Sequence, residues 1–191
     1  MSQRRAGAAD GAGALPPRGP IIVTADLGPA DLARLDALRR AHYPADRNRV
    51  PAHLTLFHHL APSLAEEAGR RLAAETRHAP PPAARIAGIM KLARGTAFRV
   101  DSPGLEAIRA RLADAFDRYL TPPDAAPWRP HITIQNKVDA SAAAALQREM
   151  ARSFRPGPIA IAGLSLWRYE DGGWAAVGRH PFNRSGRSPR N

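Results

Sequence analysis

The sequence contains no cysteine, which excludes disulfides, thiolate nucleophiles and cysteine-ligated zinc sites and fits a reducing compartment. No apolar run is long enough to cross a bilayer, and the N-terminal arginines are not followed by the apolar stretch of a signal peptide. We therefore expect a cytoplasmic protein without a membrane-spanning segment. With 191 residues, the chain is long enough for one domain with its own core.

Lysine is also scarce. Lys91 and Lys137 are the only lysines, so the other 26 of the 28 basic residues are arginine, and 17 residues are acidic. The formal charge of +11 favours anionic partners such as phosphates or nucleic acid. Residues 1–19 carry +2 of this charge and residues 182–191 carry +3, which leaves +6 on the body of the chain.

Both ends of the chain are rich in Gly, Ala, Pro, Ser and Arg and lack hydrophobic periodicity. We expect residues 1–19 to be a flexible tail, residues 20–181 to form the folded domain, and residues 182–191 to be a flexible basic tail. Ser63 and Glu66 have the spacing of a capping box at the start of a helix. The patterns predict helices starting at 28–29 and over 63–77, 103–120 and 141–154, and strands over 21–25, 84–91, 97–100, 159–167 and 174–177.

Two segments repeat one pattern, each shortly after a proline: His53-Leu54-Thr55-Leu56 and His131-Ile132-Thr133-Ile134. Successive side chains of a β-strand point to opposite faces, so the histidine and threonine of each segment share one face and the apolar residues share the other. With the apolar face in the core, each strand would present an imidazole and a hydroxyl about 7 Å apart. Two such strands side by side would form a compact pocket.

A pair of histidines suits acid–base chemistry, because the imidazole pKa is near neutral and one ring can act as base while the other acts as acid. Threonine hydroxyls on the same strands can donate hydrogen bonds to anionic oxygens. Phosphoryl transfer needs these groups and requires no metal when the leaving group is protonated. The two histidines lie 78 residues apart, about half of the folded body, which predicts two α+β lobes facing each other across a cleft.

The paired segments resemble the H-x-T-x motifs of the 2H phosphoesterase superfamily, which includes bacterial 2′-5′ RNA ligases and RNA cyclic phosphodiesterases. The resemblance extends over about residues 20–181. It implies a two-lobed α+β fold, with two antiparallel sheets facing a central cleft and helices outside, and a metal-independent site for 2′,3′-cyclic or 2′-5′ phosphodiester linkages. It assigns His53 and His131 as the acid–base pair, with the base left open, and Thr55 and Thr133 as donors to phosphate oxygens. His58 and His59 depart from the apolar residues and glycine that usually follow the first motif.

Other residues near the motifs are candidates for substrate binding. Arg49, Arg129 and Lys137 are placed to hold a second phosphate or the RNA backbone, and Trp128 is placed to stack on a base. His58 and His59 raise the alternative of a metal site, but only His59 shares the strand parity of His53 and no carboxylate accompanies them, so we expect no metal and no cofactor.

The partner that these residues favour is RNA or a nucleotide, and we expect a monomer. Two alternatives stay open: a phosphodiesterase for a small nucleotide metabolite such as an ADP-ribose cyclic phosphate, and an RNA-binding module of the same fold with little turnover.

Overall fold

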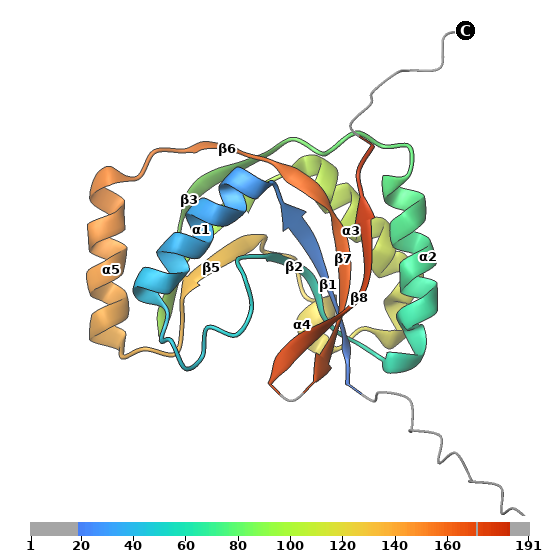
Figure 1. The fold of residues 1–191 in the computed structure, drawn as a ribbon, viewed down its shortest axis with the longest axis horizontal. Coiled ribbons are helices and arrows are strands. Elements are labelled where there is room, and N and C mark those ends of the chain that lie inside the picture. Colours follow the sequence, from blue (N-terminus) through green and yellow to red (C-terminus); the bar gives the residue numbers. More distant parts are fainter. Residues whose placement is uncertain (1–18, 171, 184–191) are drawn as a thin grey trace, which may run out of the picture.

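The computed structural model describes residues 19–170 and 172–183, which form an arch of two lobes (Figure 1). Each lobe contains a four-stranded antiparallel sheet, with strand orders β2-β1-β7-β8 and β5-β4-β3-β6. The expected α+β architecture, with two sheets around a cleft and helices outside, is confirmed. The elements are β1 (Ile21–Leu27), α1 (Pro29–His42), β2 (Leu54–Leu60), α2 (Ala65–Thr76), β3 (Ala84–Leu92), β4 (Gly95–Asp101), α3 (Pro103–Phe116), α4 (Pro122–Ala125), β5 (His131–Gln135), α5 (Ala140–Ser153), β6 (Gly157–Ile159), β7 (Ile161–Glu170) and β8 (Gly173–Pro181).

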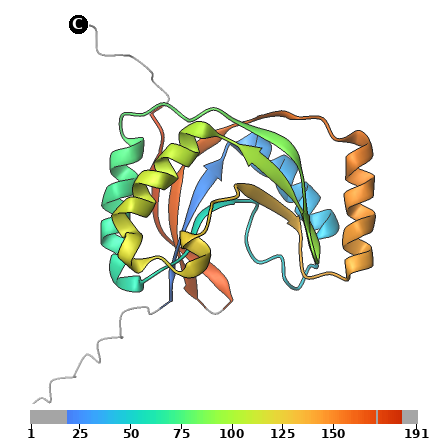
Figure 2. The same ribbon diagram turned by 180° about the vertical axis from the view of Figure 1, so that it is seen from behind.

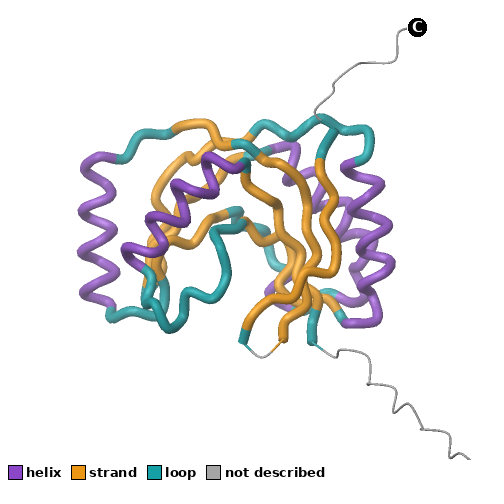
Figure 3. The backbone as a smooth tube through the Cα atoms, viewed as in Figure 1, coloured by secondary structure: helices purple, strands orange, loops and turns teal. Residues whose placement is uncertain are grey.

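The two strands that carry the motifs, β2 and β5, are edge strands of different sheets, and they contact each other where the lobes meet (Figures 1 and 3). Figure 3 shows that the strands of both lobes curve around the concave side of the arch. The apolar residues of both sheets belong to one continuous core. The join between the lobes is therefore a packed interface and not a linker.

The helices that cover each sheet come from both halves of the chain. Helix α2 packs on β7 and β8, and α3 lies beside α2, to which it is tied by the ion pair of Arg111 with Glu75 (Figure 2). Phe116 of α3 packs edge-on against Phe57 of β2, at 6.3 Å between ring centroids. Helices α1 and α5 cover the other sheet, where α1 contacts β5 and α5 contacts β3 and β4.

Several element boundaries differ from the sequence prediction for local reasons. The predicted capping box of Ser63 and Glu66 is wrong: Pro62 starts a 3₁₀ turn over Pro62–Leu64, α2 begins after it, and no side chain caps α2. The predicted strand over 159–167 is two strands in different sheets, because the backbone N–H of Ala160, the residue between them, donates to Asp31 Oδ2 at 2.9 Å instead of to a neighbouring strand.

The C-terminal end of the described chain packs on the body. Phe182 is 4% exposed and its N–H donates to the carbonyl of Ala162, and the N–H of Asn183 donates to the carbonyl of Ala79. The remainder of the two predicted tails, residues 1–18 and 184–191, lies outside the described residues. No helix within residues 19–170 and 172–183 is long and apolar enough to cross a membrane.

Candidate active site

The alternation predicted for the two motifs is present in the structure. Leu54, Leu56, Ile132 and Ile134 are fully buried in the core. His53, Thr55, His131 and Thr133 are half-buried on the opposite side of their segments. His53 immediately precedes β2 and His131 is the first residue of β5, so both imidazoles lie at the starts of the two adjacent edge strands.

The two histidine rings are held in the same way. His53 Nδ1 lies 2.7 Å from the carbonyl oxygen of Pro51, and His131 Nδ1 lies 2.7 Å from that of Arg129. A carbonyl oxygen can only accept a hydrogen bond, so each Nδ1 carries a hydrogen and donates it. Each Nε2 is therefore the atom left for proton transfer. The matched geometry fixes both tautomers and both ring orientations without using a side chain.

The environment of His53 favours its neutral form. Burial lowers the pKa of His53 to about 4, although the hydrogen bond to Pro51 acts in the opposite direction. Positive charge on Arg39, His58 and His131 lowers this pKa further. Trp174 contributes to the burial, with its ring centroid 4.6 Å from that of His53. A neutral imidazole with a free Nε2 can accept a proton, which is the requirement for a general base.

A cavity of about 620 Å³ opens beside the motifs and is lined by His53 from one motif and Thr133 from the other. Two residues that the sequence analysis selected, Arg49 and Lys137, also line it. Its remaining wall includes Arg39, Tyr43, Asp46, Arg47, Val50, His58, Asn136, Tyr169, Gly172 and Trp174. The cationic side chains outnumber the single carboxylate of Asp46, so the cavity suits an anionic ligand.

A second hollow of about 270 Å³ shares His53, Arg49 and Trp174 with the first. Trp167 also lines this hollow; its indole N–H donates to Thr24 Oγ1 at 2.8 Å, and its ring centroid lies 6.1 Å from that of Trp174. The carboxylate of Asp26 lies in the same wall, where it accepts hydrogen bonds from the side chains of Ser165 and Arg179. Aromatic faces beside polar groups are suited to a flat heterocycle.

The structure also locates the remaining predicted residues. Arg129 is exposed, and its backbone carbonyl, not its side chain, holds His131. The indole N–H of Trp128 donates to the carbonyl of Thr55 at 2.9 Å, and its half-buried ring packs against the core. Trp128 thus bridges the segment before β5 to β2. Base stacking by Trp128 and phosphate binding by Arg129 stay predictions.

Arg39 is a residue that sequence reasoning missed. It is 3% exposed, and its guanidinium donates to the carbonyl of Thr133 at 2.7 Å, to Asn48 Oδ1 at 2.8 Å and to the carbonyl of Val50 at 3.0 Å. It therefore joins α1 and the loop before the first motif to the second motif strand. In the sequence it is one of two consecutive arginines near a helix end, and nothing there separates it from exposed Arg40.

The predicted parity of His58 and His59 is wrong, because β2 is irregular. Thr55 pairs with Thr24 and Phe57 pairs with Val23, so Leu56 is an extra residue in β2. Such a bulge moves the side chains that follow it to the opposite face. His58, and not His59, consequently lines the cavity with His53.

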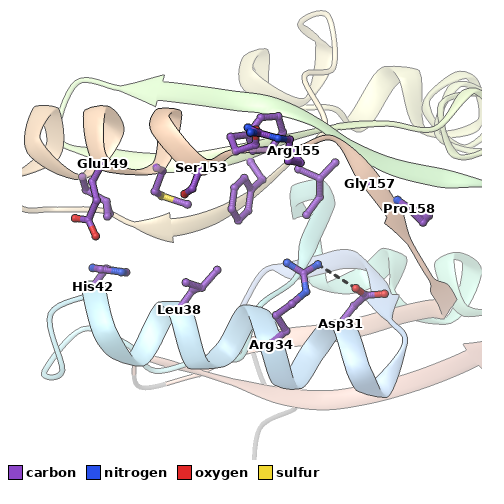
Figure 4. A pocket seen from close by; sticks show the side chains of 14 residues that line it. Asp31, Arg34, Leu38, His42, Glu149, Ser153, Arg155, Gly157 and Pro158 are labelled. Atoms are coloured by element: carbon purple, nitrogen blue, oxygen red, sulfur yellow. Dashed lines mark hydrogen bonds and ion pairs between the residues drawn. The ribbon is translucent and has the colours of Figure 1, made fainter.

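Another cavity, of about 570 Å³, lies between α1 and α5 and contains none of the four motif residues (Figure 4). Asp31, Arg34 and Leu38 project from α1 on one side, and Glu149 and Ser153 project from α5 on the other. Arg34 is already paired with Asp31 at 3.0 Å. His42 of α1 and Glu149 of α5 also line this cavity, but neither of the two motif histidines does.

In the part of the chain that the structure describes, no three His, Cys, Asp or Glu side chains are grouped as a metal site would require. A search of the curated proteins finds no significant match.

Solved structures with similar folds include E. coli LigT in complex with 3′-AMP, at 19% identity and a TM-score of 0.57 over 86% of this chain and 98% of that one. Others are a phosphoesterase, at 21% identity and a TM-score of 0.56 over 86% and 98% of the two chains, and TT0787 of Thermus thermophilus, at 18% identity and a TM-score of 0.56 over 88% and 100%. At these identities the likeness shows the shared fold. A family model described as the 2′-5′ RNA ligase superfamily matches residues 27–173, most of the chain, and the protein therefore belongs to this superfamily.

Proposed function

We propose that this protein is a metal-independent phosphodiesterase that acts on 2′,3′-cyclic or 2′-5′ phosphodiester linkages of RNA or nucleotides. The proposal rests mainly on the way His53 and His131 are held: the Nδ1 of each ring donates to the backbone carbonyl two residues earlier, which leaves both Nε2 atoms available at the junction of the lobes. Family membership supports phosphoester chemistry, and the cationic cavity supports an anionic substrate.

The two histidines have different roles in the hydrolytic direction. His53 is the base, because its lowered pKa keeps it neutral at pH 7 and able to accept a proton at Nε2. His131, protonated on both nitrogens, is the acid. Thr55 and Thr133 donate their hydroxyl hydrogens to the nonbridging phosphate oxygens, on which negative charge increases during the reaction.

The reaction balances in one displacement. His53 Nε2 takes a proton from water as the water oxygen bonds to phosphorus, and the bond from phosphorus to one ribose oxygen breaks. His131 gives its Nε2 proton to that departing oxygen. His53 ends protonated and His131 neutral, and proton exchange with solvent restores both. Ligation follows the same path with a 5′-hydroxyl in place of water: His53 takes the hydroxyl proton as its oxygen bonds to the phosphorus of a 2′,3′-cyclic phosphate, and His131 protonates the ribose oxygen whose bond to phosphorus breaks.

The substrate proposal draws on the related structures as well. Solved complexes of E. coli LigT contain 3′-AMP, ATP, NADP⁺ or phosphate. For this chain we infer a nucleotide or an RNA end as the ligand, with the scissile phosphate between the motifs and the base near Trp174 and Trp167.

A substrate panel tests this proposal. Hydrolysis is measured for 2′,3′-cyclic mononucleotides, oligonucleotides with cyclic ends, 2′-5′ dinucleotides and ADP-ribose 1″,2″-cyclic phosphate, each with and without EDTA. We expect hydrolysis of at least one class, undiminished by EDTA. His53→Ala and His131→Ala should each lower kcat by at least ~10², and the double variant should be little worse than the poorer single one.

The matched control is His78→Ala, since His78 is an exposed histidine after α2 that lines none of the cavities described above. Circular dichroism monitors folding of every variant. A folded His53→Ala protein with wild-type turnover would remove that residue from the mechanism. Complete loss of activity in EDTA, restored by one divalent ion, would replace the mechanism with metal-activated water.

A further inference from the structure

A third histidine beside the motif site is held by a buried carboxylate. His58 Nδ1 lies 3.0 Å from Asp124 Oδ1, and the Asp124 carboxylate also accepts the backbone N–H groups of His58 and His59 at 2.9 Å. The Asp124 side chain is 1% exposed. Burial by itself would raise the pKa of Asp124, but these hydrogen bonds lower it below its usual value. The carboxylate is therefore ionised at neutral pH and holds the His58 ring.

This arrangement depends on the irregularity of β2. The strand is at the edge of its sheet, so the N–H groups of His58 and His59 have no neighbouring strand on that side. The short helix α4, which contacts β2, supplies Asp124 as their acceptor (Figure 1). Arg109 donates to the carbonyl of Asp124 and lies over the Phe57 ring, at 4.9 Å from its centroid. Asp124 is thus held at its backbone by Arg109 and at its carboxylate by β2. Because the carboxylate is held, it fixes the orientation of the His58 ring.

The chemistry of His58 follows from its tautomer. A hydrogen on Nδ1 is donated to Asp124, so Nε2 is directed away from the carboxylate. The side chain is 59% exposed, and it lines the same cavity as His53 and Thr133. His58 therefore presents a ring nitrogen of fixed orientation to the ligand cavity, in addition to that of His53.

The cavity has more positive charge than the scissile phosphate requires. A cyclic phosphodiester carries one negative charge, and the two motifs already provide two imidazoles and two hydroxyls for it. Arg47, Arg49 and Lys137 also line the cavity, whereas Asp46 is its one acidic lining residue. Lys137 has a left-handed backbone, with φ of 60°, stabilised by its N–H bond to Asn136 Oδ1.

On the basis of the proposed function, we infer that His58 is a substrate-binding residue for a second phosphate group, distinct from the one that is cleaved, with Arg47, Arg49 and Lys137 around the same group. In the complex the ring carries hydrogens on both nitrogens, so that Nδ1–H stays on Asp124 while Nε2–H is donated to this phosphate. Asp124 is the positioning residue for His58. The site then prefers nucleotides that carry two separate phosphates over those that carry one.

The test measures binding, so that it does not depend on turnover. Titration calorimetry compares adenosine 3′-monophosphate with adenosine 3′,5′-bisphosphate for the wild type, His58→Asn and Asp124→Asn. His59→Asn is the matched control, because His59 is adjacent and exposed but does not line the cavity. We expect the wild type and His59→Asn to bind the bisphosphate about tenfold or more tightly than the monophosphate.

His58→Asn should abolish most of this preference while its affinity for the monophosphate changes less than about twofold. Asp124→Asn should reduce the preference as well, and if that variant does not fold, His58→Asn decides alone. Equal affinity of the wild type for both ligands, or a preference retained in His58→Asn, would overturn the inference. If the preference depends on His58 but no cyclic or 2′-5′ substrate is hydrolysed, the proposed function fails and the second phosphate site stands.

Discussion

The acid–base behaviour of His53 can be measured directly, and the structure fixes its sign. The structure lowers the pKa of His53 to about 4 from its ordinary value of 6.5. The unfolded chain therefore binds a proton at this residue as the pH falls below 6.5, whereas the folded protein binds it only near pH 4. Between these values, acid favours the unfolded state, and above pH 6.5 the residue contributes almost nothing.

The size of this effect follows from the two pKa values. From pH 7 to pH 5, protonation of the unfolded chain at His53 lowers the free energy of unfolding by about 2 kcal/mol. This is an upper value, because part of the ring faces water in the cavity. We expect His53→Gln to lack this part of the acid sensitivity. Trp174→Ala should raise the pKa of His53 toward 6.5, because it removes the ring packed 4.6 Å away.

Two measurements check the reasoning. The Cε1–H signal of His53, assigned by its loss in His53→Gln, is followed by NMR from pH 3 to pH 8. Urea unfolding at pH 7 and pH 5 gives the stabilities of the wild type and the variant. A His53 signal that titrates at 6.5 or above would refute the argument, and so would equal acid sensitivity of the two proteins. Either result would also remove the reason for choosing His53, rather than His131, as the base.

Two further substitutions test the contacts that join the lobes. Arg39→Met should lower the free energy of unfolding by about 2–4 kcal/mol, because the buried guanidinium and its hydrogen bonds to three half-buried acceptors are lost, whereas exposed Arg40→Met should have little effect. Urea unfolding that finds the two variants equally stable would contradict this role. Trp128→Phe keeps an aromatic ring but removes the donor to the carbonyl of Thr55, so it should lower the free energy of unfolding by about 1 kcal/mol and leave KM nearly unchanged. A raised KM with an unchanged free energy of unfolding would indicate that the indole contacts substrate.

The sequence predicted the parts of the site that depend on strand periodicity. The two-residue period places His53 and Thr55 opposite Leu54 and Leu56, and it does so whatever the rest of the fold. The paired motifs also identified the family that the comparisons show. These predictions needed only local alternation and one known pattern.

The missed features depend on contacts between distant residues. The position of His58 follows from a bulge that is fixed by pairing with β1 and by Asp124, which is 66 residues away in sequence. The role of Arg39 follows from its contact with Thr133, 94 residues away. No local pattern distinguishes a buried arginine that binds backbone carbonyls from its exposed neighbour. The break between β6 and β7 at Ala160 likewise involves a distant residue, Asp31.

The exchange of helices between the two sheets has a consequence for how the protein unfolds. Helix α1 lies between two strands of the first sheet in the chain but covers the second, and α3 lies between two strands of the second sheet but packs with α2 on the first. Neither sheet can keep its helical cover if the other half of the chain is removed. The two lobes should therefore lose their structure in a single cooperative transition, and neither half of the polypeptide should be an autonomous folding unit.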